Sequence, residues 1–241
     1  RTKLADGREL IYFSEDDSEK KSHSEDKRDL ESRNPTAEMR YDVISDEWIS
    51  IATARQDRAF LPPKEFDPLA PQSERNPSEI PDDYEVVVFE NRSPSFGPKL
   101  DDKNKLIKGI GSRAASTGRC EVVCFNSSTE GSFSDQTTKR AKLIIDVWAQ
   151  RTAELSSLPG IEQVYLFENR GTEIGVTLHH PHGQIYAYPF VPETMKKICK
   201  AVDRFGKNLF TEILEFELSS ERVILEGKHF SAFVPFAARW P

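Results

Sequence analysis

The sequence lacks the runs and clusters by which several classes of protein are recognised. No stretch of its 241 residues approaches the roughly 20 consecutive apolar residues that cross a bilayer, and its first residues, RTKLADGREL, lack the apolar centre of a secretory signal. No block is rich in Lys and Arg, and 33 basic against 40 acidic residues give a net charge of −7. These absences predict a cytoplasmic protein with no membrane and no nucleic-acid partner.

Cysteine is scarce, and the three cysteines do not form the pattern of a disulfide framework. Cys120, Cys124 and Cys199 are odd in number and lie among apolar residues. Cys120 and Cys124 belong to RCEVVCFN, whose β-branched residues indicate a strand, and four residues of strand separate two Cα atoms by roughly 13 Å. This distance is too long for a disulfide or for two ligands of one metal ion, so we expect both thiols to be small buried groups.

Residues 14–33 are rich in charge and poor in apolar side chains. They include 13 charged residues and a single Leu, so their burial would return little of the entropy lost on ordering. We expect a mobile linker here. The preceding LADGRELIYF has a turn signal followed by an apolar run that fits an edge strand. The predicted organisation is an N-terminal segment with its charged linker, residues 1–33, and one large domain, residues 34–241.

The remainder of the chain is rich in strand-like patterns. They comprise two hairpins, at 39–53 (turning at Ser45-Asp46) and at 222–236 (turning at Glu226-Gly227), and the four runs YEVVVFEN, CEVVCFN, EQVYLFEN and GQIYAYPF. Apolar residues at helical spacing predict helices at 135–158 and 193–210. Many strands with few helices between them indicate an α+β fold with a mainly antiparallel sheet and flanking helices.

One short motif occurs twice, as VFENR at 88–92 and LFENR at 166–170. Each copy follows an apolar run, so Asn91 and Asn169 are expected at the ends of strands. An amide in such a place either binds a ligand or closes a turn through a bond to the nearby backbone. The turn is the commoner arrangement, and the motif alone leaves both open.

Three of the five histidines lie within four residues, in LHHPHGQIYA at 178–187. On an extended strand, His180, His182 and Gln184 project to the same face. Pro181 fixes its own φ, and Gly183 lets another backbone or a phosphate approach closely. Three interpretations are open: a buried structural histidine pair, a metal site with distant ligands, and covalent catalysis in which one imidazole attacks while its neighbours hold phosphate oxygens.

The histidine segment resembles the H-P-H-G-Q signature of galactose-1-phosphate uridylyltransferases, the transferase branch of the histidine-triad superfamily. The resemblance runs from about residue 39 to residue 241. RYDVISDEWISIATARQDR is similar to the N-terminal block of the family, FENRSPSF to its uridine-binding region and LFENRGTEIGVTLHHPHGQI to its catalytic core. The resemblance implies a half-barrel of the histidine-triad type. It also implies that UDP-glucose and galactose 1-phosphate exchange a uridylyl group through a uridylyl-histidine intermediate.

The resemblance also assigns roles to residues. His182 matches the nucleophile, Gln184 the amide that binds the transferred phosphoryl group, and His180 completes the catalytic candidates. A hydrogen bond from the second ring nitrogen of His182 to a backbone carbonyl, which we place at His180, would fix its tautomer. The substrate-binding candidates are Asn91, Asn169, Thr177, Arg55, Arg58 and Leu69. Among these, Thr177 replaces a family Ser but keeps a hydroxyl, and Arg55 would reach the phosphates of the substrate bound to a neighbouring subunit.

Some members of the family carry a structural zinc, and this sequence departs from their ligand pattern. The two cysteine positions correspond to Asp67 and Ala70, the stretch near residue 129 has no His, and only His180 remains. A carboxylate of a second metal site would align near Ile198, with Glu193 close by. We therefore expect no bound metal and no cofactor.

The similarity ends in FVPFAARWP, in the middle of the family sequence. The histidines, Lys and Gln that hold the hexose phosphate in the second half of the family are absent. The chain is then a fragment, one of two companion polypeptides, or a nucleotide-binding remnant. An apolar strand edge near this end would favour a homodimer or pairing with a C-terminal companion chain. Two alternatives to uridylyl transfer are an adenylyl or ADP-sugar nucleotidyltransferase and a non-catalytic nucleotide-binding subunit.

Overall fold

The chain folds into two compact units, Arg1–Val191 and Pro192–Pro241. The computed structural model describes residues 1–16, 23–30, 37–52, 66–97, 110–174, 176 and 178–239. The boundary expected after residue 33 falls inside the first unit, and the division observed after Val191 was not expected. Among the described residues, no helix is long and apolar enough to span a membrane.

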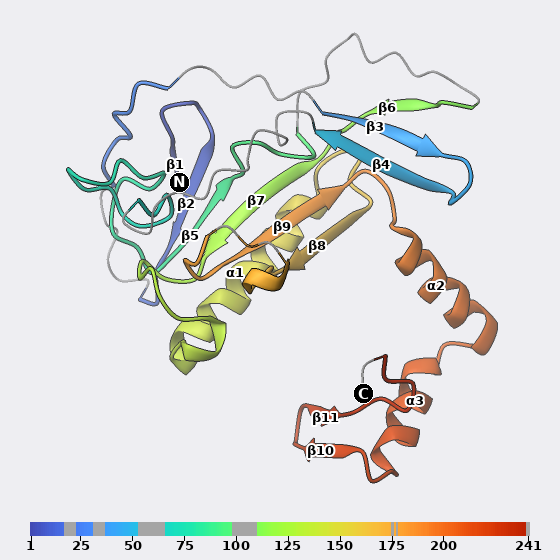
Figure 1. Cartoon of the computed structure of the whole chain (residues 1–241). Helices are drawn as coiled ribbons and strands as arrows, with labels where there is room; N and C mark the ends of the chain where they lie inside the picture. The colour runs from blue at the N-terminus through green and yellow to red at the C-terminus, as the bar shows by residue number, and fades with distance from the viewer. Residues whose placement is uncertain are drawn as a thin grey trace. The chain divides into compact units, whose positions relative to one another are not determined.

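A six-stranded antiparallel sheet forms the centre of the first unit (Figure 1). In spatial order its strands are β1 (Thr2–Lys3), β2 (Glu9–Phe13), β5 (Val86–Glu90), β7 (Arg119–Cys124), β9 (His182–Tyr188) and β8 (Gln163–Phe167). The four single runs predicted from the sequence are four of these strands, and every neighbouring pair is antiparallel. The predicted N-terminal strand is β2, which lies inside the sheet because the short β1 covers its outer edge. The α+β class is confirmed.

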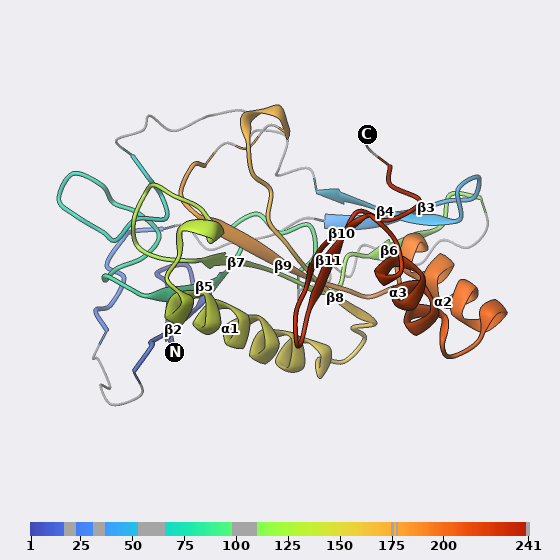
Figure 2. The same ribbon diagram turned by 90° about the horizontal axis from the view of Figure 1, so that it is seen from below.

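One face of the sheet packs against helix α1 (Thr138–Ser156), as Figure 2 shows. Ile144, Val147 and Leu155 of the helix meet inward-facing residues of the strands, including Val88 and Ile185, in one apolar cluster. The side chain of the N-cap residue Thr137 accepts a bond from the backbone N–H of Arg140. The helix begins three residues later than predicted because Phe133–Asp135 form a separate 3-10 turn.

The segment 66–84 covers part of the opposite face. Its Leu69, Ile80 and Tyr84 pack against alternate residues of β5 and β7, among them Phe89 and Cys124. All five residues of β5 are buried because this segment lies on one side and α1 on the other. The strands β9 and β8 lack this cover among the described residues, and their outward side chains are only partly buried or exposed.

A three-stranded sheet adjoins the central one. It consists of β4 (Glu47–Ala52), β3 (Ala37–Asp42) and β6 (Arg113–Ala115), with β3 in the middle. The predicted hairpin at 39–53 is confirmed, and its turn places Asp46 at a φ of 58°. Met39 of β3, Phe96 and Cys120 form the apolar cluster that joins this sheet to the central one.

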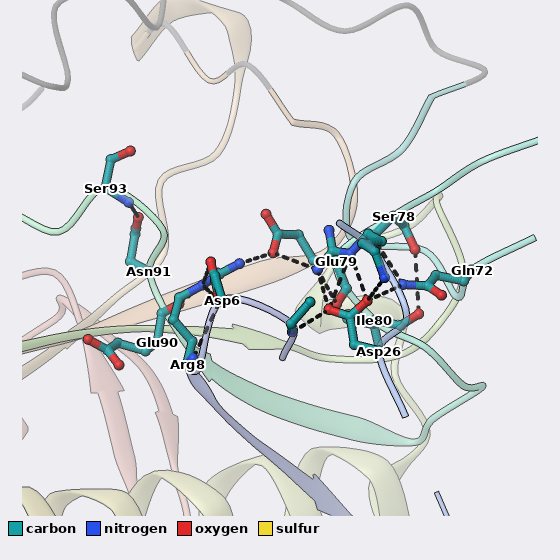
Figure 3. A network of polar contacts seen from close by, with 12 residues as sticks. Asp6, Arg8, Asp26, Gln72, Ser78, Glu79, Ile80, Glu90, Asn91 and Ser93 are labelled. Atoms are coloured by element: carbon teal, nitrogen blue, oxygen red, sulfur yellow. Dashed lines mark hydrogen bonds and ion pairs between the residues drawn. The ribbon is translucent and has the colours of Figure 1, made fainter. Parts of the chain in front are cut away.

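The prediction that residues 14–33 form a mobile linker is wrong for residues 23–30. The side chain of Asp26 in this stretch is fully buried and accepts bonds from the backbone N–H of Ala5 (2.9 Å), from Arg28 (2.7 Å) and from Gln72 (3.2 Å). Figure 3 shows this network and the neighbouring contacts of Arg8. Polar bonds rather than apolar burial hold the segment, which is why composition did not reveal its order. Residues 17–22 and 31–33 lie outside the described residues.

Arg8 extends the same network toward the end of β5. Its buried guanidinium pairs with Asp6 (2.7 Å) and with Glu79, and it donates to the backbone oxygen of Glu90 (3.0 Å). The N-terminal segment is thereby attached to the residue that precedes Asn91. It belongs to the first unit rather than to a separate domain.

The second unit contains two helices and a hairpin. They are α2 (Glu193–Phe205), α3 (Leu209–Leu218), β10 (Val223–Glu226) and β11 (Ser231–Phe233). The single helix predicted over 193–210 is wrong, because Gly206 at a φ of 102° ends α2 and a second helix follows. The hairpin is confirmed, and Val234 and Phe236 after it are exposed, as expected for apolar side chains near this end.

All three cysteines are free. Cys120 and Cys124 are fully buried, which confirms the prediction made for them. Cys199 on α2 is exposed, against the apolar surroundings that we expected.

Candidate active site

Strand β9 presents alternate side chains to the two faces of the sheet. Gly183 and Ile185 are buried toward α1, while His182 and Gln184 point to the other face and are partly buried. A Cβ atom on Gly183 would lie 3.2 Å from the ring of Phe125, so glycine lets the strand pack closely here. His180 precedes the strand, and its ring turns toward the segment 66–84, which lies on the face to which His182 and Gln184 point.

The ring of His182 is held by one hydrogen bond. Its Nδ1–H donates to the backbone oxygen of His180 over 2.7 Å, which confirms the predicted partner. Because a carbonyl oxygen only accepts, the proton is on Nδ1, and Nε2 carries a free lone pair. Among the described residues, Nε2 has no hydrogen-bond partner. Burial lowers the pKa of His182, with the positive His180 also lowering it and the bond to the His180 oxygen opposing, so the ring is neutral at pH 7.

His180 lies in a buried polar pocket. Its Nδ1 is 2.7 Å from Oδ2 of Asp67, and its Nε2 is 2.8 Å from the backbone oxygen of Asn126 and 2.9 Å from the hydroxyl of Tyr84. That hydroxyl donates its own proton to the backbone oxygen of Leu69. Both ring nitrogens therefore lie within hydrogen-bonding distance of protein oxygens, one of them a carboxylate oxygen.

Asp67 is correspondingly held as an anion. Burial raises its pKa, but the hydrogen bond and the charge of His180 outweigh burial and leave the pKa of Asp67 below its usual range. Its second oxygen accepts the backbone N–H of Leu69 over 2.9 Å. The pair is almost fully buried, with side chains 0% and 11% exposed for His180 and Asp67.

These contacts do not fit a zinc ion. A zinc ligand needs a nitrogen with a free lone pair, whereas both nitrogens of His180 already contact protein oxygens. Ala70, at the second cysteine position, has no ligating atom in its side chain. No group of three or more His, Cys, Asp or Glu side chains in the described part of the chain is arranged to hold a metal.

Gln184 lies two residues along the strand from His182, so both side chains point to the same face and their Cα atoms are roughly 7 Å apart. It is paired with Val122 of β7 on one side and Phe167 of β8 on the other. Its Oε1 is buried and has no hydrogen-bond partner among the described residues. Rotation of the amide by half a turn would put the donor Nε2 in that place, so either orientation leaves a polar atom beside His182 for a ligand to satisfy.

The two asparagines lie at opposite ends of the sheet, because β5 and β8 run in opposite directions. Asn169 is exposed, just beyond the end of β8 that pairs with Gln184. Asn91 follows β5, and its register places it roughly 12 Å from Gln184 on the same face. Asn91 is buried, and its side-chain oxygen accepts the backbone N–H of Ser93, as in the turn that the motif left open.

Comparison with known proteins now identifies the family. The sequence profile of "Galactose-1-phosphate uridyl transferase, N-terminal domain" matches residues 13–192. The chain belongs to this family.

Curated members of the galactose-1-phosphate uridyl transferase family match over most of the chain. A "Galactose-1-phosphate uridylyltransferase" of Streptomyces lividans is 46% identical and matches 100% of this chain and 64% of its own length. One of Thermotoga maritima is 36% identical over 85% of this chain and 64% of its own. The chain therefore spans less than two thirds of the length of these relatives.

Solved structures agree with this assignment. "Structure of uridylyltransferase" superposes with a TM-score of 0.70 at 25% identity and covers 85% of this chain and 63% of its own. An ADP-glucose phosphorylase of Arabidopsis thaliana, solved with bound ADP-glucose, reaches a TM-score of 0.55 at 23% identity, with 84% and 65% covered. The second likeness shows the shared fold alone.

The remaining predicted site residues are Arg55, Arg58, Thr177 and Leu69. Arg55, Arg58 and Thr177 lie outside the described residues. Leu69 is 3% exposed, and its side chain packs in the apolar cluster under the segment 66–84. Its backbone, rather than its side chain, faces the polar pocket of His180.

Sequence reasoning missed Tyr84, the oxygen of Asn126 and the bond made by Asp67. Tyr84 stands at the start of an apolar run, which predicts it in a strand. The comparison with the zinc pattern gives Asp67 no role beyond the loss of a ligand. One signal in the sequence could have revealed the contact between Asp67 and His180. An acidic residue replaces one ligand of the family's zinc pattern, while the His at another ligand position is kept.

Proposed function

We propose that this chain binds UDP-glucose and accepts its uridylyl group on His182, as the first half of an exchange with galactose 1-phosphate. Nε2 of His182 attacks the α-phosphorus, and the bond from that phosphorus to the bridging oxygen breaks. Glucose 1-phosphate leaves with the electron pair. An oxygen of galactose 1-phosphate then attacks the same phosphorus, frees the histidine and yields UDP-galactose. The chemistry is nucleotidyl transfer in galactose metabolism, which we place in the cytoplasm.

The state of His182 carries this proposal. A nucleophilic imidazole must be neutral, with its lone pair on the attacking nitrogen. The bond from Nδ1 to the oxygen of His180 and the lowered pKa of His182 supply both conditions. The nucleophile also lies on the face of β9 that points away from α1, where its side chain is partly buried.

Gln184 supports transfer rather than hydrolysis. Both the departing and the attacking groups are sugar phosphates whose oxygens are weak bases, so the site has no need of a proton donor beside the nucleophile. An amide donates to phosphoryl oxygens and stays neutral at every working pH. The buried amide atom of Gln184 that has no partner among the described residues would make that contact as Nε2, after rotation of the amide by half a turn.

The test is covalent labelling with UDP-glucose that carries ³²P at the α-phosphate. The wild-type chain should retain acid-labile label and release glucose 1-phosphate in equal amount. His182→Ala should take no label while still binding UDP-glucose, because the imidazole acts in bond formation. His179→Ala is the matched control, since its side chain is exposed next to the same segment and should label like wild type.

Three outcomes would contradict the proposal. Equal label on wild type and His182→Ala would place the covalent step elsewhere. Label from ADP-glucose but not from UDP-glucose would favour the adenylyl alternative. Binding of UDP-glucose with no label on any variant, even with a C-terminal companion chain and galactose 1-phosphate present, would favour a non-catalytic nucleotide-binding subunit. The homodimer or companion chain expected from the sequence is part of the same proposal and is tested by adding that chain.

A further inference from the structure

We propose that Asp67 is a positioning residue for His182. Its ion pair with His180 fixes the backbone oxygen that orients the nucleophilic ring. This inference rests on the proposed function for its catalytic consequence, but the geometry that it concerns can be measured without any activity.

Among the described residues, a single hydrogen bond holds the ring of His182. Its one hydrogen bond among the described residues ends on the oxygen of His180, which precedes β9 and so is not fixed by the ladder of that strand. The neighbouring Pro181 is anchored by a bond from the N–H of Phe125 (3.0 Å). The other anchor is the His180 ring, and a shift of the His180 backbone on loss of that anchor would carry the acceptor oxygen with it.

The His180 ring is anchored at both nitrogens. Asp67 holds Nδ1, while the oxygen of Asn126 and the hydroxyl of Tyr84 hold Nε2. Among these three partners only Asp67 is a carboxylate. A hydrogen bond whose acceptor is ionised is roughly twice as strong as a neutral one.

Asp67 is itself rigidly placed. Its Oδ1 accepts the N–H of Leu69 (2.9 Å), and its backbone oxygen accepts the side-chain amide of Asn76 (2.7 Å). The segment 66–76 thus holds Asp67 through contacts that do not involve His180. A chain of bonds therefore runs from this segment through Asp67 and His180 to Nδ1 of His182.

Asp67→Asn is the decisive variant, because it preserves shape and removes the charge. If the amide oxygen of the new side chain faces Nδ1 of His180, its N–H groups point at the N–H of Leu69. If the amide is turned by half a turn, its N–H groups point at Nδ1 of His180 instead. The His182 ring should then lose its single tautomer. Misplacement of a reacting group by about 1 Å costs on the order of 100-fold, so we expect the single-turnover rate of uridylylation to fall about 10- to 100-fold, with the affinity for UDP-glucose changed by less than about threefold.

Two further variants separate positioning from folding. Tyr84→Phe keeps the ring packed, removes one neutral bond beside His180 and should slow labelling in the same direction by only a few fold, about threefold. Asp26→Asn is the matched control, because it also removes a buried carboxylate that contacts the segment 66–80, through Gln72. It should lower stability yet leave the His182 tautomer and the labelling rate unchanged.

The tautomer is read directly from ¹⁵N–¹H correlation spectra of protein labelled at its five histidines, with the His182 signals assigned by their loss in His182→Ala. Wild type should show Nδ1 protonated and Nε2 bare, and Asp67→Asn should show exchange between the two tautomers. If the variant folds and keeps the wild-type pattern, the inference is overturned, whatever the labelling shows. If Asp67→Asn does not fold, Tyr84→Phe decides by the same spectra. Absence of label on wild type would refute the proposed function alone, because the spectra still decide the positioning role.

Discussion

Replacement of Asp26 by Asn should lower the free energy of unfolding by about 2 kcal/mol at pH 7 and by about half as much at pH 3. The carboxylate has no exposed surface and receives bonds from the backbone of Ala5 and from Arg28 and Gln72. Burial raises its pKa, but the bonds from Arg28, Ala5 and Gln72 together outweigh burial and bring the pKa of Asp26 down to about 2. Asn keeps the shape and loses the charge that these donors stabilise.

The magnitude follows from the difference between the folded and unfolded pKa values. The ordinary value is 3.8 and the folded value about 2, and each unit of difference is worth about 1.4 kcal/mol. Because the folded pKa is depressed, the stabilisation is complete above about pH 5 and is lost as the pH falls through 3.8 toward the folded value. At pH 3 about half of it should remain, and near pH 2 almost none.

Urea unfolding followed by tryptophan fluorescence, at pH 7, 5, 4 and 3, measures this difference between wild type and Asp26→Asn. The control is Asp16→Asn, which removes a carboxylate that is 75% exposed and pairs with Lys139 at the surface. It should change stability by less than about 0.5 kcal/mol at every pH. A difference between wild type and Asp26→Asn that stays constant from pH 7 to pH 3 would show that the charge of Asp26 is not what stabilises the segment.

Three other outcomes follow from the structure. Gly118→Ala should lower stability by about 3 kcal/mol or more, because the new Cβ would meet the backbone oxygen of Ala187 and φ is 139°. Gly7→Ala, with open space around the new Cβ, should cost only about 1 kcal/mol. Thermal melts that rank the two variants in reverse would refute this. Glu121→Leu should cost about 3–5 kcal/mol by stranding the buried Arg151, and the double variant with Arg151→Met should recover most of it in urea unfolding. Chelation with EDTA should leave the melting temperature unchanged, and one equivalent of zinc found by elemental analysis and lost together with stability would contradict our view of the His180 pocket.

Most of the central sheet was predictable, because its strands are apolar runs with clear ends. The helix α1 was predictable as well, since Ile144, Val147 and Leu155 recur at the spacing of one buried face. These elements are specified by the burial of one face, and a buried face gives a periodic pattern of apolar residues in the sequence. The break between α2 and α3 was missed because the apolar spacing continues across Gly206, while the backbone does not.

The N-terminal segment shows a different limit. Residues 14–33 contain almost no apolar side chain to bury, as their composition indicates. Residues 23–30 are nevertheless attached to the first unit, through the buried carboxylate of Asp26. A charged residue gives no sign in the sequence of whether it faces water or a partner in the interior. Its partners Ala5 and Gln72 are 21 and 46 residues away, so only the assembled sheet brings them together.

The candidate site was predictable to the extent that one motif contains it. His182, Gln184 and the oxygen of His180 lie within five consecutive residues, and strand geometry relates them. The orientation of the His180 ring was not predictable, because its partner Asp67 is 113 residues away. A buried charge at either position alone would be strongly unfavourable, so neither residue can be interpreted without its partner. Compared with the zinc pattern, Asp67 is a lost metal ligand. Its role as a partner of His180 becomes visible only when the structure places the two side chains together. The same residue that makes zinc a poor fit thereby supplies a rigid link of the kind that a metal ion would give.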